Sequence, residues 1–202
     1  MERIRAFVAL NLPVPVIEQI SKLQVELGAE AERVGLRVAW VPATNLHVTL
    51  RFLGEMPRET AFALRDRLAA GLAGRRSFGL QVRGVGAFPE LERPRVLWVG
   101  LRDDEGALAR LAAEVGGWVD ELGFAPEPRP FHPHLTLGRV KEGAGDGVGD
   151  GAGDIGTRWA DHVVGPTVPT EVVLYSSELQ RRGAEYTAIA RFALQRSGRG
   201  ER

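Results

Sequence analysis

The chain has 202 residues, 44% of them hydrophobic and 26% charged, which is the composition of an ordinary globular domain. Its 26 basic and 26 acidic residues cancel, so no global field draws it to nucleic acid or membrane, although a local basic patch remains compatible with RNA binding. The absence of cysteine excludes disulfides, thiolate catalysis and cysteine-ligated zinc. No apolar run reaches the roughly 18 residues of a membrane span, and no signal peptide is evident, so we expect a cytoplasmic protein.

The first half of the chain predicts a strand at 3–10, closed by two prolines, and a helix at about 16–32. Strands rich in β-branched and aromatic residues are predicted at 36–41 and 46–53. A second helix should follow Pro57, with one apolar stripe of Ala61, Leu64, Leu68 and Leu72.

The second half predicts strands near 78–86 and 95–101, followed by a third helix over about 104–122. Asp103 and Asp104 stand where the N-cap of that helix belongs. Further strands are expected at 132–140, 170–176 and 185–194. The glycine- and aspartate-rich residues 141–156 predict a flexible surface loop, and 196–202 a disordered tail, so one domain should span 1–195.

One tetrad, His-x-Thr-Leu, occurs twice, at residues 47–50 and 134–137. Each copy follows a strand and a helix, and the two histidines are 134 − 47 = 87 residues apart, close to half of the chain. The pattern predicts an α+β fold of two lobes related by a pseudo-twofold axis, with both tetrads at the interface between them.

Alternation along a strand puts His47 and Thr49 on one face, and likewise His134 and Thr136. Two imidazoles on opposite sides of a phosphate suit in-line displacement, since one accepts a proton from the nucleophile and the other gives one to the departing oxygen. The threonine hydroxyls would donate to the non-bridging oxygens, so this chemistry requires neither a metal nor a cofactor.

Two other interpretations of the tetrads stay open. A single His-x-Thr is most often a half-exposed sheet position, and a gene duplication alone could preserve a structural histidine. Two histidines could also hold a metal, but neither tetrad contains a carboxylate or a third histidine, and His132 is a weak candidate for the missing ligand. His162 resembles a surface residue.

Several residues near the tetrads are further candidates for substrate binding. Arg51 should lie on the same face of the strand as His47 and could bind a phosphate. Arg139 should point away from His134 unless a bulge or strand twist turns it. Arg5 lies on a neighbouring strand. Four aromatic residues could stack a base or pack in the core: Trp40, Phe88, Trp98 and Phe131.

The paired tetrads resemble those of the two-histidine phosphoesterase superfamily. The chain is most similar to the bacterial and archaeal RNA 2′,3′-cyclic phosphodiesterases, long called 2′-5′ RNA ligases. The likeness includes RAFVALNLP, HVTLRFLGE, PRVLWVGL, FHPHLTLGRVK and SSELQRRGAEYTAIARFAL, in the family's order. Residues 141–156 depart from the family, whose members commonly keep more regular structure there.

The resemblance implies a bilobal α+β fold, with antiparallel sheets lining a central cleft and helices outside. It implies hydrolysis of an RNA 2′,3′-cyclic phosphate to a 2′-phosphomonoester. We expect the RNA substrates to include tRNA fragments and the protein to be a monomer. It assigns water activation to His134, protonation of the leaving 3′ oxygen to His47, and phosphate binding to Thr49 and Thr136. The family's 2′-5′ ligation is the same chemistry in reverse.

Two alternative functions remain at this point. The enzyme could act on another cyclic phosphate or on a 2′-5′ linkage. The chain could also be a non-catalytic binder of RNA ends that has lost turnover, although the intact histidines and threonines of both halves argue against this.

Overall fold

The structure is a computed structural model that describes residues 2–141, 155, 158–180 and 183–196. The described strands are β1 Arg3–Asn11, β2 Val38–Trp40, β3 Val48–Pro57, β4 Leu80–Phe88, β5 Val96–Arg102, β6 His134–Val140, β7 Val163–Thr167, β8 Glu171–Gln180 and β9 Gly183–Ala193. The described helices are α1 Val14–Arg33, α2 Arg58–Leu72, α3 Ala107–Asp120 and the short 3₁₀ helix η1 Ala43–Asn45.

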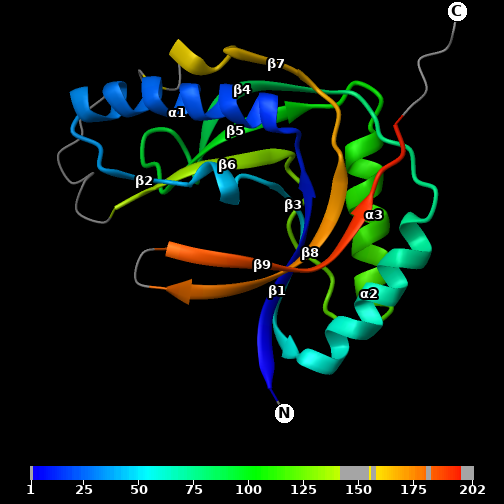
Figure 1. Ribbon diagram of the computed structural model, residues 1–202. Coiled ribbons are helices and arrows are strands. Elements are labelled where there is room, and N and C mark those ends of the chain that lie inside the picture. The colour runs from blue at the N-terminus through cyan, green and yellow to red at the C-terminus, as the bar shows by residue number, and fades with distance from the viewer. Residues whose placement is uncertain (1, 142–154, 156–157, 181–182, 197–202) are drawn as a thin grey trace, which may run out of the picture.

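All nine strands belong to one sheet, in the order β7-β4-β5-β6-β3-β1-β8-β9, with β2 paired to β6. Every pair of neighbouring strands is antiparallel. The two lobes expected from the repeat are therefore halves of one continuous sheet, as Figure 1 shows.

The two halves of the sheet meet at a single residue pair. β3 and β6 are joined only where Val48 pairs with Leu135, and these two residues hold the second position of the two tetrads. An antiparallel pair at equivalent positions has a local twofold axis between its members, so the sequence repeat and the structural symmetry coincide there. This confirms the bilobal α+β fold with pseudo-twofold duplication.

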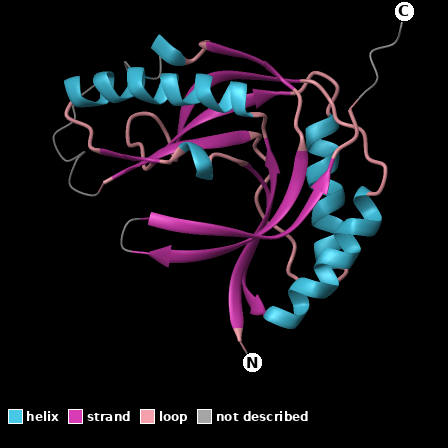
Figure 2. Cartoon of the chain, viewed as in Figure 1, coloured by secondary structure: helices cyan, strands magenta, loops and turns pink. Residues whose placement is uncertain are grey.

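Helices cover the sheet on the face opposite the histidines, and α1 and α3 each cover the half of the sheet to which the strand before them does not belong. α1 follows β1 but packs against β2 and β7, whereas α3 follows β5 but packs against β3. α2 packs against β3, β9 and α3. Figure 2 shows α1 along one lobe and the α2–α3 pair along the other. The two halves of the sheet are thus interlocked by α1 and α3.

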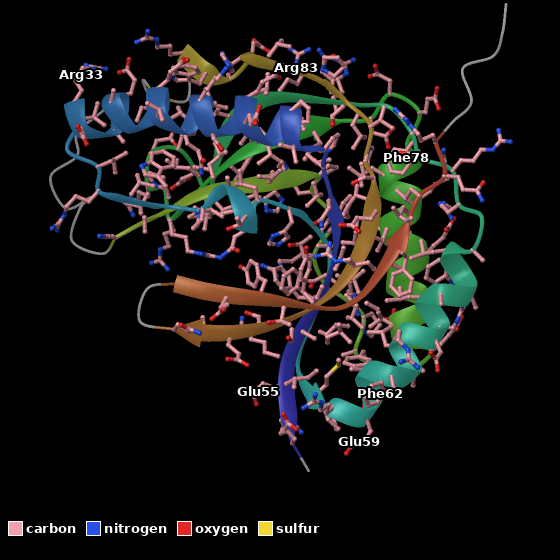
Figure 3. The ribbon with its side chains drawn as sticks, in the orientation of Figure 1. Arg33, Glu55, Glu59, Phe62, Phe78 and Arg83 are labelled. Atoms are coloured by element: carbon pink, nitrogen blue, oxygen red, sulfur yellow. The ribbon has the colours of Figure 1, made fainter. Side chains whose placement is uncertain are left out.

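A single hydrophobic core fixes these helices to the sheet. α1 buries a stripe at helical spacing, and the core-facing residues of the tetrads, including Val48, Leu135 and Leu137, are fully buried. Burying a side chain of this size contributes about 1.5–3 kcal/mol. Charged side chains such as Arg33, Glu59 and Arg83 lie on the periphery (Figure 3).

A β-bulge falls on the last residue of each tetrad. Ala9 pairs with Thr49 but Val8 pairs with Arg51, so the ladder skips Leu50. Trp98 pairs with Thr136 but Leu97 pairs with Gly138, so the ladder skips Leu137 in the same way. A bulge reverses the alternation of side chains beyond it, which changes the face on which each following residue lies.

Every predicted helix and strand is present, with ends displaced by a few residues. The structure adds β7, which the sequence did not indicate because Gly165 and Pro166 interrupt its apolar pattern. α3 begins at Ala107, later than expected, so its N-cap is Gly106 and the placement of the cap at Asp103 or Asp104 is wrong. Asp103 nevertheless accepts a hydrogen bond from the Leu108 amide at 2.5 Å. The expected flexible loop lies largely outside the described residues, although Ile155 within it is buried in the core. The expected tail lies outside them beyond residue 196.

Among the described residues, no helix combines the length and the apolar character needed to cross a membrane.

Candidate functional site

Both tetrads lie where β3 and β6 meet, on the face of the sheet that the helices leave uncovered; we call it the tetrad face. The Val48–Leu135 pair sets His47 beside Thr136 and Thr49 beside His134, because antiparallel strands run in opposite directions from their paired residues. Each histidine thus has a threonine on its own strand and another on the facing strand.

The same hydrogen bond orients both imidazoles. Nδ1 of His47 lies 2.7 Å from the carbonyl oxygen of Asn45, and Nδ1 of His134 lies 2.7 Å from that of His132. A carbonyl oxygen can only accept, so Nδ1 must carry the proton in each ring. Nε2 is therefore left to exchange protons with a substrate.

The neutral His47 ring forms a second hydrogen bond, as an acceptor at Nε2. Nε2 of His47 lies 3.1 Å from the hydroxyl oxygen of Thr49, which donates to it in this tautomer. The hydroxyl can turn away toward a phosphate oxygen when the imidazole is protonated, because a Ser or Thr hydroxyl rotates freely between partners.

Aromatic rings surround each histidine. The centroid of the His47 ring lies 4.9 Å from Phe7, 5.4 Å from Tyr186 and 6.4 Å from Tyr175. Around His134, the nearest ring centroids are those of Phe88 at 4.9 Å, His132 at 5.7 Å and Trp98 at 6.3 Å.

Burial in these aromatic surroundings lowers the pKa of His47 to about 4; the Asn45 carbonyl opposes this shift and a positive charge on His134 adds to it. Burial also lowers the pKa of His134, opposed by the His132 carbonyl and reinforced by the charge of His132. At neutral pH both imidazoles are thus neutral in the free protein and ready to accept a proton. A negative charge placed beside either ring would raise its pKa, because it favours the protonated form.

The bulges decide where the two candidate arginines lie. Arg51 is not on the tetrad face: only 7% of it is exposed, and its guanidinium lies 2.7 Å from Asp120 on α3 and donates to the Ala125 carbonyl. The prediction that Arg51 lies on the same face of the strand as His47 is therefore wrong, because the bulge at Leu50 turns its side chain toward the helices.

Arg139 is turned the other way by the equivalent bulge at Leu137. Its side chain is exposed, and it is close enough to Tyr186 that its charge, with that of Arg5, opposes the burial that raises the tyrosine's pKa. Neither arginine has an ion-pair partner among the described residues. Two uncompensated cations thus lie near Tyr186, whose ring meets that of His47.

The other candidates from the sequence divide between the site and the core. Phe88 and Trp98 lie beside His134, whereas Trp40 and Phe131 are partly buried against the core. His162 lies away from the tetrads, with its ring 4.7 Å from that of Trp159. No cluster of three or more His, Cys, Asp or Glu with metal-binding geometry occurs in the described part of the chain.

Sequence patterns did not reveal the aromatic residues around His47 or the backbone acceptor of each histidine. Asn45 and His132 were detectable in principle, because they stand two residues before His47 and His134 and share their 87-residue offset. No local signal joined Tyr175 and Tyr186 to His47, because that contact depends on how β8 and β9 pair with β1.

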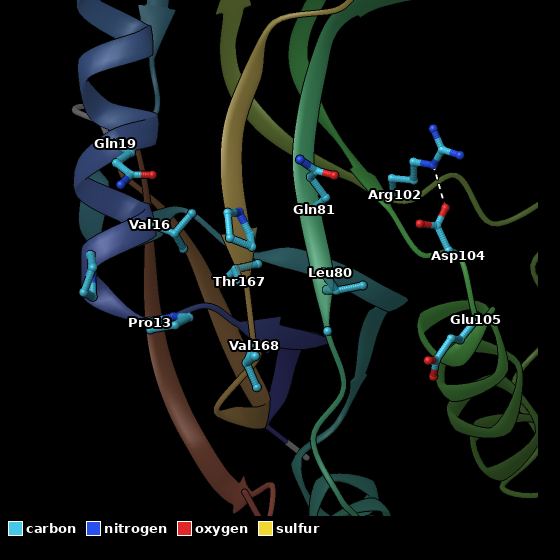
Figure 4. Close-up of a pocket in the computed structure, with 13 residues that line it drawn as sticks. Pro13, Val16, Gln19, Leu80, Gln81, Arg102, Asp104, Glu105, Thr167 and Val168 are labelled. Carbon is cyan, nitrogen blue, oxygen red and sulfur yellow. Dashed lines mark hydrogen bonds and ion pairs between the residues drawn. The ribbon is translucent and has the colours of Figure 1, made fainter. Parts of the chain in front are cut away.

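Other hollows of the surface are separate from the histidines. A pocket of about 620 Å³ lies between the start of α1, β4 and β7 and is lined in part by Pro13, Leu80 and Thr167 (Figure 4). A second, of about 730 Å³, lies between the start of α2 and the strands β1, β8 and β9. Neither contains a tetrad residue.

Comparison with known proteins agrees with the geometry. The family model described as LigT like Phosphoesterase matches residues 10–98 and again 99–186, so each match contains one tetrad. The chain belongs to this family of LigT-like phosphoesterases, within the two-histidine superfamily, and is an enzyme of that class.

Named relatives cover nearly the whole chain. It is 36% identical to an RNA 2′,3′-cyclic phosphodiesterase of Aeropyrum pernix over 165 aligned residues. These residues make up 82% of this chain and 91% of the relative. It is 35% identical over 191 residues to the protein of the same name from Escherichia coli K12, 94% of this chain and 96% of that one.

Solved structures share the fold. Escherichia coli LigT complexed with ATP superposes with a TM-score of 0.70 at 31% identity, covering 96% of this chain and 99% of that chain. A protein of Thermus thermophilus, TT0787, gives a TM-score of 0.72 at 28% identity, covering 96% and 100%.

Proposed function

We propose that this phosphoesterase hydrolyses an RNA 2′,3′-cyclic phosphate to a 2′-phosphomonoester, with one imidazole as general base and the other as general acid. The observation that supports it most is the Val48–Leu135 pair, which relates two imidazoles by a local twofold axis with Nε2 left to react in each. The relatives named RNA 2′,3′-cyclic phosphodiesterase support the substrate. So do the structures of Escherichia coli LigT with ATP, 3′-AMP and phosphate.

In the proposed reaction, water attacks the phosphorus atom while Nε2 of His134 accepts its proton. The bond from phosphorus to the 3′ oxygen breaks, and Nε2–H of His47 gives that oxygen a proton, which leaves a 3′-hydroxyl and a 2′-phosphate. Each imidazole contributes about 10²–10⁴-fold in rate as a positioned acid or base.

The family resemblance, and not the free-state pKa, assigns the acid to His47. With a pKa of about 4, the free His47 is neutral at pH 7 and must gain its proton as substrate binds. The anionic cyclic phosphate provides the reason, because its charge acts strongly on an imidazole enclosed by aromatic rings. A positive charge on both rings at once is disfavoured, since each lies in the field of the other. One protonated and one neutral imidazole is the state that the reaction requires.

The phosphate itself would be held by hydroxyls and by cationic side chains. Thr49 and Thr136 flank the histidines and would donate to the non-bridging oxygens as negative charge develops on them. Arg139 and Arg5, both without an ion-pair partner among the described residues, would bind the phosphate or the next phosphate of the RNA chain. Arg51 is left out of this set because Asp120 already holds it.

The test is an end-product assay with an oligonucleotide that ends in a 2′,3′-cyclic phosphate, in buffer with EDTA. We expect complete conversion to the 2′-phosphomonoester at a rate that EDTA does not change, because both proton transfers are made by imidazoles. A 3′-phosphate product or loss of activity in EDTA would contradict the proposed mechanism. Tight, salt-sensitive binding without turnover would identify a non-catalytic binder of RNA ends, and turnover of only another cyclic phosphate or a 2′-5′ dinucleotide would change the substrate.

A further inference from the structure

Beyond Ser176, β8 and β9 leave the sheet as a two-stranded hairpin that we call the ribbon, which comprises residues 177–180 and 183–186. β1 pairs with β8 only as far as Ser176, so within the described residues the strands of the ribbon pair with each other alone. Figure 1 shows β8 and β9 extending together from the sheet. Most residues of the ribbon are exposed, including Leu179 at 76%. Because an isolated two-stranded hairpin is only marginally stable in water, the ribbon needs a further contact to keep one position.

One side chain from the first half of the sequence provides that contact. Nδ2 of Asn45, the last residue of η1, donates a hydrogen bond to the carbonyl oxygen of Ala184 on β9 at 2.8 Å. In the part of the chain that the structure describes, no other side-chain hydrogen bond and no ion pair joins the ribbon to the rest of the protein. The Asn45 amide is therefore the polar tie that fastens the ribbon.

Asn45 also holds the proton-bearing nitrogen of His47. Its main-chain carbonyl oxygen lies 2.7 Å from Nδ1 of His47, and this bond orients the ring. The ribbon adds a second restraint, because the Tyr186 ring meets the His47 ring edge to face, with 5.4 Å between centroids and 84° between planes. Tyr186 stands two residues after Ala184, the residue that Asn45 fastens. Both restraints on the His47 ring therefore depend on Asn45.

The second tetrad has no equivalent of this tie. His132 stands at the position that corresponds to Asn45, and its carbonyl oxygen orients His134 in the same way. Its side chain instead packs against aromatic rings, including that of Trp98 at 4.7 Å between centroids, and makes no hydrogen bond to another strand among the described residues. The pseudo-twofold symmetry breaks at this position, so of the two reactive imidazoles it is that of His47 which is coupled to the ribbon.

On the basis of the proposed function, we infer that Asn45 is a positioning residue: its amide fastens the ribbon, and the fastened ribbon aims Nε2–H of His47 at the departing 3′ oxygen. A general acid must be held closely in place, since a misplacement of about 1 Å can cost about 10²-fold in rate. Loss of the tie should weaken protonation of the leaving oxygen and leave the activation of water by His134 nearly unaffected.

The experiment compares Asn45→Ala with the wild-type protein on two substrates that differ in their leaving group. One is an oligonucleotide that ends in a 2′,3′-cyclic phosphate, whose 3′ oxygen needs a proton. The other is a 3′-deoxynucleoside 2′-(4-nitrophenyl) phosphate, whose leaving group departs without one. We expect kcat to fall about 10–100-fold on the cyclic phosphate and at most about threefold on the ester, with little change in KM for either. A residue that only stabilised the fold would lower both rates by the same factor.

Amide hydrogen exchange tests the fastening itself. In Asn45→Ala the amides of the ribbon should exchange faster because the tie is lost, whereas those of β1 and β3 should stay protected. Gln180→Ala is the matched control, since it removes a side-chain hydrogen bond within the ribbon, to Glu185, and leaves the tie to Asn45 intact. It should retain the wild-type rate on both substrates.

Equal losses in Asn45→Ala on the two substrates, an unchanged kcat on the cyclic phosphate, or ribbon amides that exchange at the wild-type rate would overturn the inference. A loss in Gln180→Ala as selective as that in Asn45→Ala would do the same. In each of these cases the proposed function would stand, because the wild-type protein would still convert the cyclic phosphate to a 2′-phosphate. A wild-type protein that does not make this conversion would refute the proposed function, and the inference with it.

Discussion

Replacement of either tetrad histidine by alanine is expected to lower kcat for an RNA 2′,3′-cyclic phosphate by about 10²–10⁴-fold. In the proposed mechanism His47 and His134 each transfer one proton in the same step, so the loss of either ring removes one of the two transfers. The double variant should be little worse than either single one, because groups that act together in one step do not contribute additively. Single-turnover rates at saturating RNA measure the effect directly.

The control for this experiment is a histidine outside the site. His162→Ala should retain the wild-type rate, and circular dichroism and thermal unfolding should show that the two tetrad variants remain folded. Near-full activity in either His47→Ala or His134→Ala would show that the two-histidine mechanism is wrong.

Arg51 and Arg139 should respond in opposite ways to the same substitution. Arg51→Met is expected to lower the free energy of unfolding by about 2–3 kcal/mol, because it removes the buried partner of Asp120. This is below the usual cost of breaking a fully buried pair, since a third of the Asp120 side chain is exposed. Where Arg51→Met is folded, its kcat/KM should stay within about threefold of wild type, since a group that contacts no substrate contributes nothing to transition-state binding. Urea denaturation and steady-state kinetics measure the two effects.

Arg139→Met is the matched comparison. We expect its free energy of unfolding to change by at most about 0.5 kcal/mol, the usual effect of a surface substitution. Its KM for the RNA substrate should rise about tenfold, because one charge-assisted hydrogen bond to phosphate is lost. If Arg51→Met raised KM and Arg139→Met destabilised the fold, the assignment of the two side chains to opposite faces would be wrong.

The sequence predicted the centre of the fold better than its details. The duplicated tetrad, set in matching strands and helices, was sufficient to indicate two halves and an axis between His47 and His134. It succeeded because alternation along a strand is reliable for the few residues of one tetrad. The same rule failed at Arg51, one residue beyond the tetrad, where a bulge interrupts the alternation.

The unpredicted parts depend on contacts between segments far apart in the chain. Tyr175 and Tyr186 reach His47 only because β8 pairs with β1 and β9 pairs with β8. The exchange of helices between halves depends in the same way on packing, since the apolar stripe of α1 does not specify which half of the sheet it covers. β7 escaped detection because Gly165 and Pro166 are typical of turns.

The two symmetry-related imidazoles have different roles in the proposed reaction, and a change of leaving group tests this difference most directly. A 3′-deoxynucleoside 2′-(4-nitrophenyl) phosphate has a leaving group that departs without protonation, whereas the 3′ oxygen of the cyclic phosphate requires a proton. His47→Ala should therefore lose about 10²–10⁴-fold on the cyclic phosphate but stay close to the wild-type rate on the nitrophenyl ester. His134→Ala should be slow on both substrates, because both reactions need water to be activated. Equal losses for the two variants on both substrates, or recovery of His134→Ala alone on the ester, would contradict the assignment.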